Sequence, residues 1–469
     1  MTPIIERSAL ALAAAIRRRE VTARDVVEAH IERLQAFAPS TNAVVAERFD
    51  SARAEAEAAD RRVAASDHPE ELPVLLGVPF TVKESIALAG MPQSAGVVAR
   101  SEYQARESAP AVQRLADAGA IPLGVTNTSE LTLWIESVNR LYGRSSNPYD
   151  ITRAAGGSSG GEGAAVGSGG SPFGVGADIA GSIRIPALFC GVFGHKPSPG
   201  LITNEGLYPD TPGEAGRMLQ VGPLSRRGED LMPVLRIMAD SPETLSDPAD
   251  VALDGLQVTT VEDSSLLPMS RDLRDARERA VGALLARGAV VRRIALRSWR
   301  RAALPYLVTL QAGAGHTTRA LLEAAGAELG GWRTFVRRGG HHTLPTRITL
   351  AAEALPQLDA PRDKLLGAAK SLAQELTDAI GNGVLLHPAH PRPAPRHGRT
   401  VGRAWLVTPA AVFNLAGVPV TEVPLGLNAA GLPLGVQVAA GAGRDHVAIA
   451  TALELERVFG GWIPPEVPR

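Results

Sequence analysis

The feature that most constrains this chain is the segment from Ala155 to Gly200, in which serine and glycine are far denser than an ordinary domain core requires. Glycine lets the backbone adopt positive φ and approach a ligand closely, at a cost in chain entropy that a purely structural segment avoids. Apolar residues such as Ala164, Val166 and Val175 lie between the glycines, which indicates burial and argues against a flexible linker. We therefore expect a tightly folded loop with a chemical role.

Three familiar loop chemistries fit this segment poorly. A phosphate-binding loop ends in Gly-Lys-Ser/Thr, and here Glu162 stands where the lysine should be. A dinucleotide fingerprint starting at Gly161 has its third glycine, Gly167, one place late. The G-x-S-x-G elbow of α/β-hydrolases is matched around both Ser158 and Ser159, but overlapping matches in glycine-rich sequence are weak evidence, and no later histidine stands out as a partner.

A longer pattern explains the segment better. Ser182 stands in AGSIRIP at 180–186, and Lys83 lies well upstream in GVPFTVKE at 77–84. With GGSSGG at 156–161 and CGVFGHKP at 190–197, these motifs resemble the amidase signature family, whose pattern is long and specific. HPAHPRPAPRH at 387–397 and FGGWIPP at 459–465 are similar to one branch of that family, the fatty-acid amide hydrolases of the second type. The similarity fades between residues 264 and 381.

The resemblance implies a nucleophile at Ser182, a bridging serine in a cis peptide bond at Ser158, and a base at Lys83. Serine is a weak nucleophile at its free pKa, so it needs a base within hydrogen-bond reach. Lysine is a base only when neutral, and burial beside apolar residues such as Phe80 lowers its pKa, provided that no carboxylate lies near it. Side chains alternate along an extended segment, so we expect Glu84 to point away from Lys83.

The resemblance also implies an oxyanion hole made by the backbone N–H groups of Ile179, Ala180, Gly181 and Ser182 at the start of a helix, where such donors are unpaired. The sequence departs from the family here. Ala180 stands where the family usually has glycine, and Ala177 where it usually has threonine. If position 180 needs positive φ, the Cβ strains the site by about 1–2 kcal/mol, and we then expect reduced or redirected activity.

Three further residues are expected to support the site without reacting. They are Ser159, Asp178 and Arg184. Asp178 and Arg184 are equally well explained as a structural ion pair, since buried pairs serve both purposes.

Charge and composition exclude several partners. The formal net charge of the 469 residues is −1, which gives no electrostatic footprint for nucleic acid. No run approaches the length of a membrane helix, and the arginines follow the short apolar stretch Ser8–Ile16 instead of preceding it, which disfavours a secretory signal. Cys190 is the only cysteine, as in proteins of the reducing cytoplasm.

No cofactor and no metal are expected. The pairs His341/His342 and His387/His390 lack the spacing and the carboxylate of a zinc site. The expected partner is a small-molecule amide, and a homodimer is possible on this sequence.

The alternation of strand-like and helical runs predicts an α/β fold with a largely parallel β-sheet surrounded by helices. The resemblance implies the amidase signature fold, a large mixed, mostly parallel sheet surrounded by helices. Helices are expected at Glu6–Arg18, Thr22–Ala36 with Thr22 as its N-cap, Phe49–Ala65, Pro110–Ala118, Gly160–Gly167, Leu273–Arg287, Pro409–Leu415 and Asp445–Phe459. Strands are expected at Val78–Val82, Ile121–Val125, Phe173–Ala177, Leu256–Val261, Ala289–Ile294, Gly383–Leu386, Val420–Pro424 and Leu434–Ala439.

The motifs flank the divergent middle, so one large amidase signature domain with an insertion is expected over residues 1–469. Its expected parts are an N-terminal helical layer (1–70), a catalytic core (71–263), a variable helical substrate cap (264–381) and a C-terminal return to the core (382–469). The cap contains Trp299, Tyr306, Trp332 and Phe335, and the Pro- and Gly-rich stretches Ser198–Gly228 and Pro388–Gly402 are expected to be loops around the mouth of the site.

The sequence thus predicts a hydrolase that cleaves carboxamides through an acyl-enzyme on Ser182, with a preference for an apolar or fatty acyl group and an ester side activity. Two alternatives remain. One is the A-type subunit of a glutamine-dependent amidotransferase, which uses the same triad to release ammonia. The other is a non-catalytic scaffold, suggested by Ala177 and Ala180.

Overall fold

The computed structural model describes residues 2–262, 268–296, 298–329, 340–353 and 359–467. Within them the chain forms one eleven-stranded sheet, in the order β1-β3-β2-β6-β8-β7-β12-β13-β11-β9-β10, and a two-stranded ribbon, β4-β5. The strands are β1 (Val44–Glu47), β2 (Pro79–Lys83), β3 (Ile121–Thr126), β4 (Val138–Asn139), β5 (Gly143–Arg144), β6 (Phe173–Asp178), β7 (Phe193–Lys196), β8 (Gln220–Ser225), β9 (Gln257–Val261), β10 (Val290–Ile294), β11 (Val384–His387), β12 (Val420–Leu427) and β13 (Pro433–Ala440).

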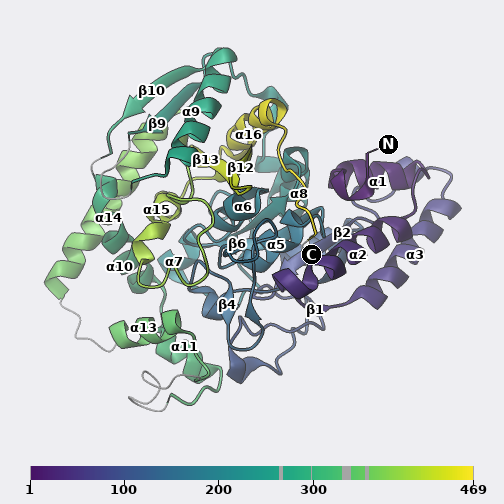
Figure 1. The fold of residues 1–469 in the computed structure, drawn as a ribbon, viewed down its shortest axis with the longest axis horizontal. Helices are drawn as coiled ribbons and strands as arrows, with labels where there is room; N and C mark the ends of the chain where they lie inside the picture. Colours follow the sequence, from purple (N-terminus) through teal and green to yellow (C-terminus); the bar gives the residue numbers. More distant parts are fainter. Residues whose placement is uncertain (1, 263–267, 297, 330–339, 354–358, 468–469) are drawn as a thin grey trace.

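The sheet is mixed, as predicted, and helices surround it (Figure 1). Parallel pairing joins β2 to β3 and β6 at one side and β9 to β10 and β11 at the other. The strands between these blocks, and the edge strand β1, pair antiparallel. Parallel pairing is therefore confined to these two blocks, and the central strands are joined by antiparallel pairing.

All eight predicted strands and all eight predicted helices are present. The helices at Phe49–Ala65, Gly160–Gly167 and Asp445–Phe459 have the predicted bounds, and the other elements differ at one or both ends. The helices are α1 (Ala9–Arg17), α2 (Ala23–Thr41), α3 (Phe49–Ala65), α4 (Pro110–Asp117), α5 (Gly160–Gly167), α6 (Arg184–Cys190), α7 (Gly213–Met218), α8 (Leu231–Met238), α9 (Arg271–Ala286), α10 (Ala303–Gly313), α11 (Thr318–Ala324), α13 (Leu344–Glu353), α14 (Asp359–Ile380), α15 (Thr408–Ala416) and α16 (Asp445–Phe459). The Thr22 hydroxyl accepts a hydrogen bond from the N–H of Asp25 (2.9 Å), which confirms the predicted N-cap.

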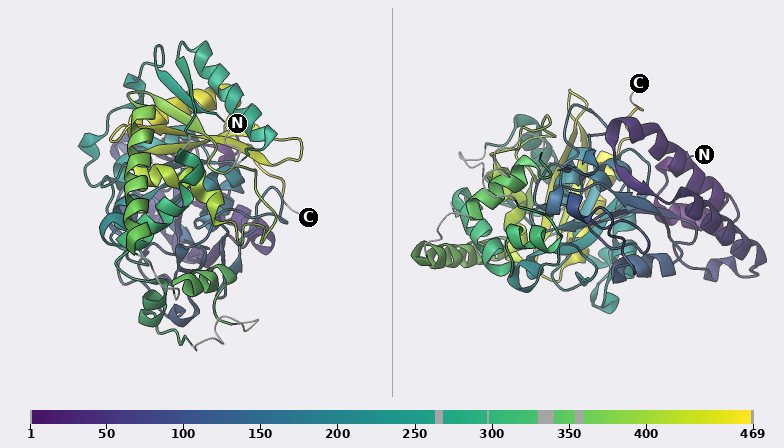
Figure 2. Two further views of the ribbon diagram at one scale, coloured as in Figure 1. Left: turned by 90° about the vertical axis from the view of Figure 1, so that its left-hand side faces the viewer. Right: turned by 90° about the horizontal axis from the view of Figure 1, so that it is seen from below.

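The N-terminal helices lie together at one end of the molecule (Figures 1 and 2). α2 packs on α3, and α3 packs on β3. Their buried faces carry small and branched side chains such as Val26, Val27, Ala52 and Ala56. The helical layer expected for residues 1–70 stays a prediction; β1 lies within that range and pairs with β3 in the main sheet.

Two buried helices, α5 and α6, meet at the centre of the molecule, and every residue of both is buried. Glycine makes this close contact possible. A Cβ on Gly163 would lie 2.9 Å from the Cβ of Pro186, and one on Gly167 would lie 2.7 Å from the carbonyl oxygen of Cys190. The glycine density of this segment therefore has a packing cause as well as a chemical one.

Two expectations about the irregular segments need correction. The stretch Ser198–Gly228 is not only a loop, because it contains α7 and β8. The segment 264–381 is not only a cap, since β10 is the edge strand of the main sheet and α9 packs on β13. Trp299 and Tyr306 are buried in an apolar cluster with residues of α14 and α15, while Trp332 and Phe335 lie outside the described residues.

Candidate active site

The residues predicted to react come together at the ends of central elements. Lys83 is the last residue of β2, Ser158 lies just before α5, and Ser182 lies between β6 and α6. The Lys83 Nζ atom donates a hydrogen bond to Ser158 Oγ at 2.7 Å. The peptide bond between Gly157 and Ser158 is cis, as the family resemblance implied.

Lys83, Ser158 and Ser182 line one small cavity of about 40 Å³. Ser182 is 6% exposed, whereas Lys83 and Ser158 are each 1% exposed. No hydrogen bond joins the Ser158 and Ser182 hydroxyls in the described part of the chain. The remaining walls are mostly apolar or hydroxyl-bearing: Ser85, Thr132, Ala177, Ile179, Leu207, Tyr208, Pro209, Thr211 and Leu219.

Burial controls the charge of the lysine. Desolvation lowers the pKa of Lys83 to about 7, although the nearby carboxyl groups of Asp178 and Glu162 act in the opposite direction. The condition set for a lowered pKa, that no carboxylate lies near the amine, is therefore not met, yet burial still lowers the pKa. Burial raises the pKa of Glu162 to about 8, against hydrogen bonds with Thr81 (2.7 Å) and Thr126 (3.0 Å). Near neutral pH, Glu162 is thus mostly uncharged and stabilises the protonated form of Lys83 only weakly.

Glu84 is turned away from Lys83, as the alternation along β2 predicted. Its Oε1 atom accepts hydrogen bonds from the N–H of Ser94 (2.6 Å) and from the hydroxyl of Tyr142 (3.1 Å). No hydrogen bond or ion pair joins Glu84 to Lys83 within the described residues.

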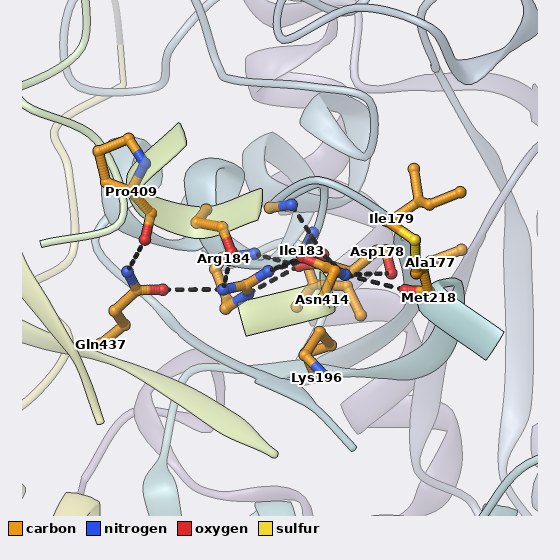
Figure 3. A network of polar contacts seen from close by, with 12 residues as sticks. Ala177, Asp178, Ile179, Ile183, Arg184, Lys196, Met218, Pro409, Asn414 and Gln437 are labelled. Carbon is orange, nitrogen blue, oxygen red and sulfur yellow. Dashed lines mark hydrogen bonds and ion pairs between the residues drawn. The ribbon is translucent and has the colours of Figure 1, made fainter. Parts of the chain in front are cut away.

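Asp178 and Arg184 form a fully buried ion pair, with Oδ1 and Nη2 2.9 Å apart. Figure 3 shows this pair at the centre of a polar network that extends to Asn414 and Gln437. Arg184 donates to Gln437 Oε1 (2.9 Å) and to Asn414 Oδ1 (2.6 Å), and Asn414 Nδ2 donates to Asp178 Oδ1 (2.9 Å). Burial alone raises the pKa of Asp178, but Arg184 and these hydrogen bonds hold it well below its ordinary value.

The Asp178 carboxylate also organises the turn that carries Ser182. It accepts hydrogen bonds from the N–H groups of Gly181 (2.7 Å) and Ile183 (3.1 Å). Gly181 has φ +105°, and a Cβ there would lie 2.5 Å from the Cβ of Ala410. Ala180 does not have positive φ, so the strain considered for a Cβ at this position does not arise.

The N–H of Gly181 is therefore occupied, which removes one of the four donors expected for an oxyanion hole. No acceptor among the described residues takes the N–H groups of Ile179, Ala180 or Ser182. Ser159 lies behind the site, where its N–H donates to the carbonyl of Ser182 (3.2 Å) and its hydroxyl to the carbonyl of Ala177 (3.3 Å).

Several contacts at the site were not predicted from the sequence. Ser137 Oγ donates to the carbonyl of Ser158 (2.8 Å) and accepts from the N–H of Gly160 (2.8 Å), so it fixes the turn before α5. Tyr306, in α10, donates its hydroxyl proton to the carbonyl of Ile179 (2.8 Å). Ser137 lies 21 residues before Ser158, and Tyr306 lies 127 residues after Ile179, so the fold brings both to the motif.

The described walls of this cavity contain no His, Cys, Asp or Glu side chain. Among the described residues, the group with the spacing of metal ligands is His68, Glu70 and Glu71, all exposed. The chemistry available in the cavity is that of an amine, hydroxyls and backbone N–H groups. A mixed sheet that brings a buried lysine and two serines into one cavity defines an α/β enzyme with a hydroxyl-based site.

Comparisons with known proteins agree with this class. The sequence profile of the Amidase family matches residues 25–448. The chain is 42% identical to fatty-acid amide hydrolase 2-A of Danio rerio, over 99% of this chain and 90% of that relative. It is 40% identical to fatty-acid amide hydrolase 2 of Homo sapiens, over 99% and 91% of the two chains. The chain belongs to the amidase signature family, and it is an amide hydrolase that resembles the fatty-acid amide hydrolases.

Solved structures support the fold. A crystal structure of an amidase superposes with a TM-score of 0.82 at 29% sequence identity, covering 97% of this chain and 100% of the other. A bacterial aryl acylamidase also superposes with a TM-score of 0.82, over 97% of each chain, but at 23% identity this likeness concerns the fold alone.

In the described part of the chain, no helix is both long and apolar enough to cross a bilayer.

Proposed function

We propose that this protein cleaves carboxamides through an acyl-enzyme on Ser182, with Ser158 as a proton relay and Lys83 as the base. The observation that carries the proposal is the 2.7 Å hydrogen bond between Lys83 Nζ and Ser158 Oγ in a buried site. A lysine with a pKa of about 7 is substantially neutral at physiological pH, so it can accept a proton.

In this mechanism Ser182 Oγ attacks the amide carbonyl while its proton passes to Ser158 and the Ser158 proton passes to Lys83. The proton then returns along the same path to the departing amine, because an amide nitrogen leaves only when it is protonated. Acid and base assistance of this kind contributes about 10² to 10⁴ in rate. The relay requires the hydroxyls of Ser158 and Ser182 to come within hydrogen-bond distance when substrate binds, and such contacts often tighten in the complex.

The oxyanion is assigned to the free N–H groups of Ile179, Ala180 and Ser182. Each well-placed donor is worth about 10² to 10³ in rate. Gly181 acts differently, because its N–H is held by Asp178. Asp178 and Arg184 are positioning residues that fix the turn and the start of α6.

The proposed substrate is an amide with an apolar acyl group, which the two relatives named as fatty-acid amide hydrolases support. Ile179, Leu207 and Leu219 give the cavity apolar walls. Its volume of about 40 Å³ suits the reacting carboxamide, so a long acyl chain has to extend beyond these walls.

The experiment is mass spectrometry of the intact protein trapped with short-chain, long-chain and aryl amides. The proposal predicts an acyl adduct on Ser182 that accumulates fastest with long-chain amides and is absent in Ser182→Ala. Trapping with aryl amides alone would keep the mechanism and overturn the fatty acyl preference. No adduct with any amide, together with no labelling by a fluorophosphonate, would instead support a non-catalytic scaffold.

The amidotransferase alternative has support of its own. The chain is 31% identical to the A-type subunit of the glutamyl-tRNA(Gln) amidotransferase of Deinococcus radiodurans, over 99% of each chain. This function predicts glutaminase activity that appears only with partner subunits. Higher identity to the fatty-acid amide hydrolases favours the amide hydrolase that works alone.

We also propose a cytoplasmic location, on the ground that the only cysteine, Cys190, is buried and unpaired. A homodimer stays a prediction, to be checked by light scattering.

A further inference from the structure

A second and much larger cavity, of about 920 Å³, shares none of its described lining residues with the catalytic cavity. We call it the arginine cavity, because five arginines line it: Arg153, Arg392, Arg396, Arg399 and Arg403. Four of them come from the segment that follows β11, and the turn between β12 and β13 contributes another wall. This segment was predicted from the sequence only as a loop near the mouth of the site.

The positive charge of the arginine cavity is not neutralised by acidic side chains in its described lining. Arg153 pairs with Asp150 (2.9 Å). The exposed side chains of Arg392, Arg396, Arg399 and Arg403 make no ion pair or hydrogen bond in the described part of the chain. No acidic side chain belongs to the described lining. Because the whole chain has 48 basic and 49 acidic residues, this excess of positive charge is a property of the cavity.

The backbone that carries these arginines is firmly anchored. The buried carboxylate of Glu136 accepts hydrogen bonds from the N–H groups of Gly398 (2.8 Å) and Thr400 (3.2 Å). Arg153 donates to the carbonyl of Ala394 (2.7 Å). The N–H of Arg399 bonds the carbonyl of Arg396 (3.2 Å), so one turn carries both side chains. Anchored arginines lose less freedom on binding a ligand.

The residue types indicate the class of ligand. Guanidinium groups match phosphate and carboxylate oxygens in a bidentate manner. One carboxylate neutralises a single arginine, whereas a phosphate monoester carries about −1.5 to −2 charges at neutral pH and suits a cluster of them. The lining also includes Trp405, which is 48% exposed, and the buried residues Met269 and Leu432, so part of the ligand can be apolar.

Two buried polar atoms of the lining residues add to this picture. His390 Nε2 and Ser270 Oγ have no hydrogen-bond partner among the described residues. The pKa of His390 is lowered by burial to about 4, so its ring is neutral. Buried polar atoms in folded proteins nearly always have a hydrogen-bond partner, so we expect a ligand or a water molecule to partner these two atoms.

We propose that the arginine cavity is a second binding site, which takes a phosphate ester with an apolar portion. The phosphate lies against Arg396 and Arg399, and the apolar portion lies against Trp405. The ligand is either a phospholipid headgroup or a soluble phosphate ester. This site is separate from the catalytic cavity, so a test of this proposal does not depend on whether the proposed function is correct.

Isothermal titration with inorganic pyrophosphate tests the phosphate contact. We expect the double substitution R396Q/R399Q to weaken binding at least about tenfold while the melting temperature and amide hydrolysis stay unchanged. The matched control is R61Q/R62Q, which removes two exposed arginines from α3 and should leave binding intact.

Sedimentation with phosphatidylcholine vesicles, with and without phosphatidic acid, separates the two sources. Binding that requires phosphatidic acid and is lost in R396Q/R399Q identifies a phospholipid headgroup. Pyrophosphate binding without vesicle binding identifies a soluble ester. The proposal is overturned if the unmodified protein binds neither probe, or if R61Q/R62Q loses as much binding as R396Q/R399Q.

Discussion

At the scale of single residues, the site depends on which buried groups stay charged. Lys83 and Glu162 are both buried. Burial lowers the pKa of Lys83 to about 7 and raises that of Glu162 to about 8, so near pH 7 most of Glu162 and a substantial fraction of Lys83 are neutral. Asp178 behaves oppositely, because Arg184 stabilises its charged form. The site therefore holds one permanent ion pair and keeps its amine available as a base.

The buried ion pair should be costly to break. Asp178→Asn leaves the Arg184 guanidinium buried without its counter-ion, so we expect the free energy of unfolding to fall by about 3–5 kcal/mol, measured by chemical denaturation. The depressed pKa of Asp178 means that its contribution is complete above the ordinary pKa of an aspartate and is lost as the pH falls.

A solvent-exposed pair provides the control for that measurement. Glu20→Gln removes the partner of Arg18; the two side chains are 50% and 61% exposed, so the free energy of unfolding should change little. Equal effects of Asp178→Asn and Glu20→Gln would contradict the assigned role of the buried pair.

Exchange of glycine and alanine should have different effects at two neighbouring residues of the Ser182 turn. Gly181→Ala places a Cβ at φ +105° and 2.5 Å from Ala410, so we expect a loss of at least about 1–2 kcal/mol in stability and a lower kcat/KM. Ala180→Gly relieves no strain, because Ala180 lacks positive φ, and should leave kcat/KM unchanged. A gain in activity for Ala180→Gly would show that the alanine does hinder the oxyanion site.

At the scale of elements, the contact between α5 and α6 sets the position of both serines, because Ser158 precedes one helix and Ser182 precedes the other. Gly167 faces the Cys190 carbonyl, which is backbone and cannot move aside alone. We predict that Gly167→Ala forces the helices apart and lowers the free energy of unfolding by about 1–3 kcal/mol, as measured by chemical denaturation.

Gly282, in the interior of α9, offers a matched control, because nothing lies within 4 Å of a Cβ at that position. Gly282→Ala should raise stability by about 0.5–1 kcal/mol, since alanine is the better helix former. If both substitutions stabilise the protein, the close packing of α5 on α6 does not constrain the site as described.

At the scale of the whole molecule, the sequence predicted the elements that have a regular apolar pattern and the site residues that lie in a continuous motif. The strands at β2, β3 and β6 have regular apolar runs, and the motif gave Lys83, Ser158 and Ser182 by resemblance. β7 and β8 were not predicted from the sequence, because glycine interrupts β7 and glycine and proline interrupt β8. All residues of both strands are buried in the sheet. The order of strands depends on connections that local periodicity does not encode.

The polar partners of the site were harder to predict for the same reason. Asn414 and Gln437 reach Arg184 from more than two hundred residues away, and no local pattern marks them. The occupied N–H of Gly181 and the neutral state of Glu162 depend on distances and burial, which only the folded chain defines.

The pH dependence of Ser182 acylation tests the central claim most directly, with acyl-enzyme formation followed by rapid-quench mass spectrometry. The base must be neutral, so the acylation rate should rise as the pH passes through about 7 and level off above it. Lys83→Met should remove this rise and slow acylation by at least about 10². A rate that does not change with pH through this range, or undiminished acylation in Lys83→Met, would contradict the account.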